Sequence, residues 1–105
     1  MNKIQIENLI KYVNAGKIKW TEHCSFRMFQ RGIYKKEVEL AIKKGTIIEQ
    51  YPGDFPYPSC LVVGKDSKRK TMHIVCGCGE ENLYIITVYY PHQEKWIDEF
   101  SRRKK

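Results

Sequence analysis

The chain has 105 residues, 42% of them hydrophobic and 12% aromatic, and its net charge is +7 at pH 7. This length and composition are typical of one folded domain over residues 1–105, with a flexible basic tail at 101–105. No apolar run approaches the ~20 residues that span a membrane, and the N-terminus lacks a signal-peptide pattern, so we expect a cytoplasmic protein without membrane contact.

The positive charge is concentrated at the two ends of the sequence. Residues 1–44 hold ten Lys or Arg and four acidic residues, a net charge of +6, whereas residues 45–100 hold five and eight, a net charge of −3. Residues 102–105 add +4. This asymmetry favours an anionic partner, either nucleic acid or an acidic protein, although a solvated lysine-rich surface is the plainer interpretation.

The first part of the chain has the apolar spacing of amphipathic helices. We predict three of them, over residues 3–14, 22–31 and 34–44. Asn2 is the expected N-cap of the first helix. Thr21 is the expected N-cap of the second, and Gly32 is expected to end it.

After Gly45 the apolar period changes from helical to extended. Four strands are predicted, over residues 46–51, 59–64, 71–78 and 83–90. Apolar residues around Trp96 predict a short helix that folds back after the last strand. Helices followed by sequential hairpin strands predict an α+β fold, with N-terminal helices packed on a four-stranded antiparallel sheet.

The second predicted helix carries His23, Arg27 and Arg31 at i, i+4 and i+8, so these side chains would lie along one face. Phe26, Phe29 and, less squarely, Met28 lie on another side and are expected to anchor the helix in the core. A histidine exchanges protons near neutral pH, and two arginines beside it suit either cleavage or binding of a phosphodiester. In the alternative interpretation, His23 only caps or packs the start of the helix.

Two strands add candidate site residues. Alternation places His73 on the face of its strand opposite the apolar face, where a groove could form. Thr87 and Tyr89 share a face of the last strand, and a tyrosine can bind phosphate and stack on an unpaired base. The plainer interpretations are a satisfied sheet histidine and ordinary strand propensity.

The sequence contains four cysteines, Cys24, Cys60, Cys76 and Cys78. Their spacing does not match a zinc site, and without a secretory signal we expect free thiols. The chain has no phosphate-binding loop, no dinucleotide fingerprint and no set of metal ligands. We therefore predict no metal and no cofactor.

An ordered set of short motifs, W-T-E-H, R-G-I, A-I-K-K-G-T-I-I-E, C-L-V-V-G, M-H-I-V-C-G and I-I-T-V-Y-Y-P, covers most of the chain. This set resembles a bacterial group of small domains of unknown function that are distant relatives of RelE- and BrnT-type toxins. The resemblance implies a RelE-like or barnase-like fold and a toxin that acts beside a small antitoxin. Such toxins are often metal-independent endoribonucleases that attack free or ribosome-bound RNA.

Our first hypothesis is therefore a toxin-like endoribonuclease, in which general acid–base catalysis makes the RNA 2′-hydroxyl attack the adjacent phosphate. Its expected partners are RNA and an acidic antitoxin protein. The residues assigned to this site are His23, His73, Arg27 and Arg31 for catalysis, and Thr87 and Tyr89 for substrate binding. The alternative is a non-catalytic module that binds nucleic acid or protein, in which the same cations would bind and neither histidine would matter.

Overall fold

The computed structural model of the chain describes residues 3–91. In chain order, its elements are α1 (Ile6–Asn14), β1 (Ile18–Trp20), α2 (Glu22–Arg31), α3 (Lys35–Lys43), β2 (Thr46–Tyr51), β3 (Ser59–Lys65), β4 (Thr71–Cys78) and β5 (Leu83–Tyr89). The predicted α+β class is confirmed. The helix predicted around Trp96 and the basic tail lie outside the described residues. In the described range, no helix is long and apolar enough to cross a membrane.

The sheet has five strands in the order β1-β5-β4-β3-β2, and it is mixed because β1 runs parallel to β5. The prediction of a four-stranded antiparallel sheet is wrong in this respect. With only three residues, β1 is too short to show the alternation that identifies a strand in a sequence. It becomes a strand through its pairing with β5, where Ile18 lies opposite Leu83 and Trp20 opposite Ile85.

The first helix starts later than predicted. Gln5 occupies the N-cap position and the helix begins at Ile6. The side-chain amide of Gln50 on β2 accepts a hydrogen bond from the Ile4 N–H (3.1 Å) and donates one to the Ile4 carbonyl (2.9 Å). The chain before Ile6 is therefore held against β2 instead of continuing the helix.

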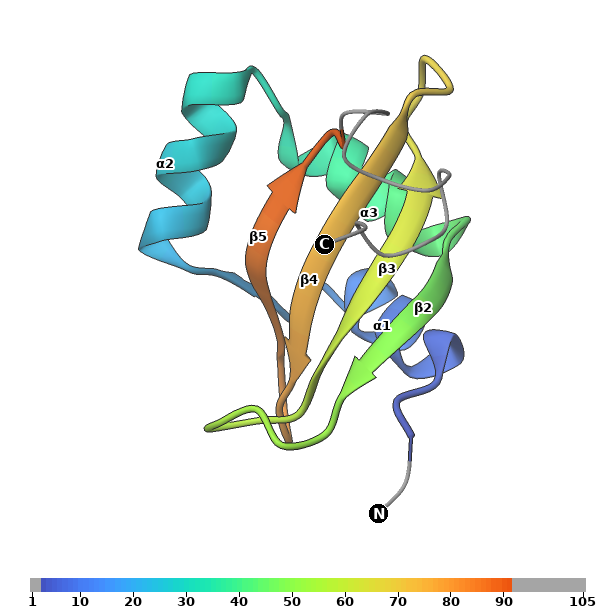
Figure 1. Cartoon of the computed structure of the whole chain (residues 1–105), viewed down its shortest axis with the longest axis vertical. Helices are drawn as coiled ribbons and strands as arrows, with labels where there is room; N and C mark the ends of the chain where they lie inside the picture. The colour runs from blue at the N-terminus through green and yellow to red at the C-terminus, as the bar shows by residue number, and fades with distance from the viewer. Residues whose placement is uncertain (1–2, 92–105) are drawn as a thin grey trace, which may run out of the picture.

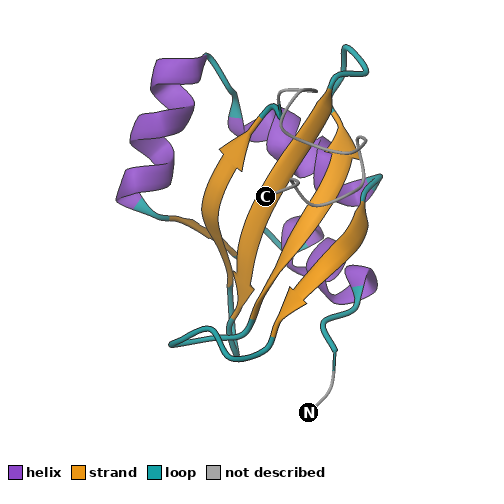
Figure 2. Ribbon diagram, viewed as in Figure 1, coloured by secondary structure: helices purple, strands orange, loops and turns teal. Residues whose placement is uncertain are grey.

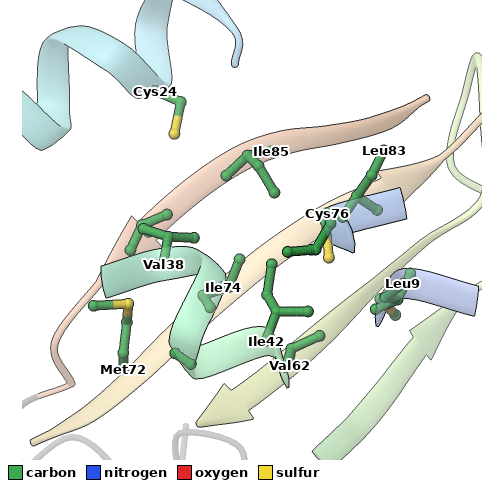
Figure 3. Close-up of a cluster of buried hydrophobic side chains, with 14 of the residues drawn as sticks. Leu9, Cys24, Val38, Ile42, Val62, Met72, Ile74, Cys76, Leu83 and Ile85 are labelled. Carbon is green, nitrogen blue, oxygen red and sulfur yellow. The ribbon is translucent and has the colours of Figure 1, made fainter. Parts of the chain in front are cut away.

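Helices α1 and α3 cover one face of the sheet, and α2 lies beside β5 (Figures 1 and 2). Side chains from all three helices meet β3, β4 and β5 in one apolar cluster, part of which is shown in Figure 3. The closest approach is at Gly64 of β3, where a Cβ atom would lie 2.0 Å from the Ala41 carbonyl oxygen of α3. The four cysteines are free thiols, as predicted.

A bulge in β5 decides which of its side chains leave the core. Ile85 pairs with Cys76, but Thr87 pairs with Val75, so Ile86 is an extra residue on β5. Such an extra residue reverses the alternation of the strand. Before the bulge, odd-numbered residues such as Ile85 face the helices. After it, Thr87 and Tyr89 belong to the opposite side of the sheet, which we call the far face.

Candidate functional site

Helix α2 forms as its sequence predicts. The Thr21 side chain accepts a hydrogen bond from the Cys24 N–H (3.1 Å), which satisfies one of the unpaired donors at the helix start. Gly32 follows the helix in the left-handed conformation (φ 66°), where glycine has no Cβ to strain. Both ends of α2 are therefore set by local residues, at the predicted positions.

The two sides of α2 are not the predicted ones. Cys24 and Met28 are the buried residues of the helix, whereas Phe26 is 58% exposed and Phe29 is 84% exposed. The expectation that the helix is anchored in the core is therefore confirmed for Met28 and wrong for Phe26 and Phe29. Because α2 packs beside the sheet, only the narrow stripe at i and i+4 reaches the core. The four apolar residues of α2 are spread around the helix and cannot all lie in one such stripe. The sequence therefore already indicated that some of them would be exposed.

The three basic residues of α2, which are His23, Arg27 and Arg31, also separate into two roles. Arg31 stands three residues after Met28 and turns toward β5, where its Nη1 donates a 2.8 Å hydrogen bond to the Val88 carbonyl. His23 and Arg27 are exposed, as are Phe26 and Phe29. We call His23, Phe26, Arg27 and Phe29 the outer surface of α2. It combines two aromatic rings with one permanent cation and one titratable ring.

The neighbourhood of Arg31 also affects a buried thiol. Burial raises the pKa of Cys24 to about 11, although the positive charge of Arg31 acts in the opposite direction. The thiolate is the reactive form of cysteine, so Cys24 is inert near neutral pH. Cys24 is therefore a packing residue of α2 and not a nucleophile.

The other candidate residues meet on the far face. His73 and Tyr89 are direct partners across β4 and β5, and their ring centroids lie 5.4 Å apart at an interplanar angle of 49°. Thr87 lies on the same face, opposite Val75. His73 is fully buried, and Tyr89 and Thr87 are half-buried. The structure thus brings His73 of β4 together with Thr87 and Tyr89 of β5 on one face.

His23 is not brought to this group. The Thr21 N–H bonds the Ile85 carbonyl (3.4 Å), so the start of α2 lies beside Ile85, whereas His73 pairs with Tyr89. The partners of these two β5 residues on β4 are Cys76 and His73, three residues apart, so the two positions are about 10 Å apart at the rise of roughly 3.3 Å per strand residue. His23 is exposed on α2, whereas His73 is buried on the far face. Among residues 3–91, no three His, Cys, Asp or Glu side chains are grouped to hold a metal ion.

Comparison with known families identifies the family of the chain. Residues 20–90, more than half of its length, match the family described as a domain of unknown function, DUF4258. The chain belongs to the DUF4258 family. The DUF4258 match starts at Trp20 and ends at Tyr90, so it includes α2, α3 and strands β2–β5 but leaves out α1. No curated protein and no solved structure matches the chain.

Proposed function

We propose that this DUF4258 domain binds single-stranded RNA through the outer surface of α2. The observation that carries the proposal is the exposure of Phe26 (58%) and Phe29 (84%) beside the exposed Arg27. Exposed aromatic rings offer stacking surfaces for unpaired bases, and a neighbouring arginine can bind the phosphates between them. Adjacent large apolar side chains left in water commonly mark a binding site.

The charge of the chain supports the same ligand. The net charge of +6 over residues 1–44 includes α2 and both of its neighbours in sequence. Close to α2, the Lys35 ammonium lies 5.4 Å from the centroid of the Trp20 ring. A polyanion would therefore be attracted to this part of the molecule before any specific contact forms.

Binding can be tested by fluorescence anisotropy with a labelled single-stranded RNA of about 12 nucleotides. Each of Phe26→Ala and Phe29→Ala should weaken binding by roughly 5- to 150-fold, because stacking contributes about 1–3 kcal/mol per base. Phe55→Ala is the matched control, since Phe55 is 95% exposed in the β2–β3 loop, away from α2. Equal effects at Phe55 and Phe29, or no binding by the wild type, would remove the proposal.

A second candidate function is metal-independent cleavage of RNA, and the contact between His73 and Tyr89 favours it. In this function His73 would accept the proton of the RNA 2′-hydroxyl as its oxygen attacks the adjacent phosphorus, and would return a proton to the 5′-oxygen that leaves. Tyr89 and Thr87 would position the substrate. In this second candidate function, the domain would be related to RelE- and BrnT-type toxins. An acidic antitoxin would then compete with RNA for the outer surface of α2. Since His73 is buried, RNA would first have to gain access to the far face.

Cleavage can be tested with end-labelled RNA, with and without EDTA and with ribosomes in a parallel reaction. Use of the RNA 2′-hydroxyl should leave a 2′,3′-cyclic phosphate, and DNA should stay intact. His73→Asn should lower the cleavage rate far more than the affinity for RNA, whereas Arg27→Ala should lower the affinity. Intact RNA in every condition would leave binding as the function of the domain.

A further inference from the structure

The turn between β3 and β4 is fastened to the start of α3. The Glu37 carboxylate of α3 accepts hydrogen bonds from the Ser67 N–H (2.7 Å) and from the Ser67 hydroxyl (2.9 Å). These contacts bring two basic stretches together that are more than 30 residues apart in the sequence. We call the exposed cations of the two stretches the basic ridge: Lys35, Lys36, Lys68, Arg69 and Lys70.

The two carboxylates next to the ridge both accept hydrogen bonds from the protein. Glu37 is occupied by Ser67, as described above. The Asp66 Oδ1 accepts the N–H groups of Lys68 and Lys70, both at 2.8 Å, and its Oδ2 accepts the Tyr90 hydroxyl at 2.7 Å. Burial alone would raise the pKa of Asp66, but these hydrogen bonds together outweigh burial and lower it. Five exposed cations against these two carboxylates leave the ridge with a net charge of +3.

The backbone of the turn is held in one conformation. Arg69 adopts a positive φ of 67°, and its N–H bonds the Asp66 carbonyl at 3.0 Å. The Asp66 N–H in turn bonds the Lys70 carbonyl, also at 3.0 Å. The three basic residues of the turn are thus presented from a backbone that its own hydrogen bonds fasten, which reduces the entropy lost on binding.

The ridge lies at the same end of the molecule as the C-terminal end of α2. The last turn of α2, the first turn of α3 and the β3–β4 turn lie at the same end of the molecule (Figure 1). Between α2 and the ridge lies Tyr34, which is 73% exposed and directly precedes Lys35. In chain order, the exposed aromatic residues Phe26, Phe29 and Tyr34 are followed directly by the first two cations of the ridge, Lys35 and Lys36.

We propose that the basic ridge binds the phosphodiester backbone of the same RNA strand whose bases stack on α2. This inference rests on the proposed RNA-binding function and extends it from one helix to a path across two further elements. The ridge offers five ammonium or guanidinium groups against two carboxylates that already accept hydrogen bonds, an excess of positive charge that suits a polyphosphate ligand. Tyr34 is the stacking residue where the path passes from α2 to the ridge.

The test measures RNA affinity as a function of salt concentration for two variants that change the net charge equally. Lys36→Glu/Lys68→Glu alters the ridge, and Lys11→Glu/Lys17→Glu alters two exposed lysines of α1 and the segment after it. Losing two phosphate contacts should reduce the slope of log K against log salt by about 1.4 and weaken binding at 0.1 M salt by about 25-fold. The Lys11/Lys17 variant should keep the wild-type slope. Thermal unfolding checks that both variants are folded.

Each outcome decides between the two proposals. If the ridge variant binds as the wild type does, while Phe26→Ala and Phe29→Ala lose affinity, RNA is confined to α2 and the ridge inference is wrong. Equal losses in both charge variants would indicate general attraction and would also overturn it. If the wild type binds neither RNA nor single-stranded DNA of the same sequence, the proposed function fails and the ridge inference fails with it.

Discussion

The outer surface of α2 and the far face of the sheet contain similar residue types in opposite environments. On α2, His23 is exposed together with Phe26 and Phe29. On the far face, His73 is fully buried against Tyr89. Histidines and aromatic rings thus occur at both places, yet the α2 residues are exposed, whereas His73 is enclosed and Tyr89 is half-buried. The comparison shows that burial, and not residue type, distinguishes the two groups.

The two faces of the sheet should differ most in their tolerance of an added methyl group. Gly64→Ala would place a Cβ atom 2.0 Å from the Ala41 carbonyl oxygen, whereas at Gly77, on the far face, the nearest atom is the Ile86 Cδ1 at 3.6 Å. We expect Gly64→Ala to lower the free energy of unfolding by about 3 kcal/mol or more, and Gly77→Ala to change it by less than about 0.5 kcal/mol. Urea denaturation measures both. Equal losses would mean that the far face is packed as tightly as the helical side.

The two sides of α2 provide the next comparison. Met28→Ala removes a buried side chain and should lower the free energy of unfolding by about 2–4 kcal/mol. Phe29→Ala removes a side chain that is 84% exposed and should change it by less than about 0.5 kcal/mol, while it weakens RNA binding. Chemical denaturation and anisotropy on the same two variants test this. A large loss of stability in Phe29→Ala would show that the ring packs on the protein and is not available to RNA.

Asp66 links the basic ridge to Tyr90, the residue after β5, and should make the free energy of unfolding depend on pH. Its pKa is lowered in the folded state, so it stabilises the fold above its unfolded pKa of about 4, and this contribution is lost as the pH falls through the folded value. Asp66→Asn should lower the free energy of unfolding at pH 7 by roughly 1–3 kcal/mol, because two N–H groups and the Tyr90 hydroxyl lose a charged acceptor. Denaturation at pH 7 and at pH 3 should find a smaller difference between variant and wild type at the acid pH. A difference that does not change with pH would contradict this role.

The smallest effects should separate the two arginines of α2. Arg31→Ala loses the hydrogen bond to the Val88 carbonyl and should lower the free energy of unfolding by about 1 kcal/mol, with little change in RNA affinity. Arg27→Ala should leave stability unchanged and weaken RNA binding. Thermal unfolding and anisotropy on both variants measure the pair. The reverse pattern would move the binding surface from the outer side of α2 to its C-terminal end.

Local sequence patterns determined most elements of this protein. Thr21 and Gly32 bound α2 because a side-chain cap and a left-handed glycine act within a few residues of the helix ends. The alternation of apolar residues placed β2–β5 within one residue of their observed limits. The excess of positive charge in residues 1–44 also followed directly from the sequence. The helix ends and the strands depend on residues at most a few positions away, and the net charge depends on composition alone.

Tertiary structure alone decided how those elements combine. β1 is a strand only because β5 pairs with it, and the bulge at Ile86 moves Thr87 and Tyr89 beside His73, although simple alternation would keep them with Ile85. Which side of α2 is buried depends on its position beside β5, and the basic ridge depends on the contact between Glu37 and Ser67. Each of these features joins residues distant in the sequence, and the periodicity of a single element carries no information about such contacts.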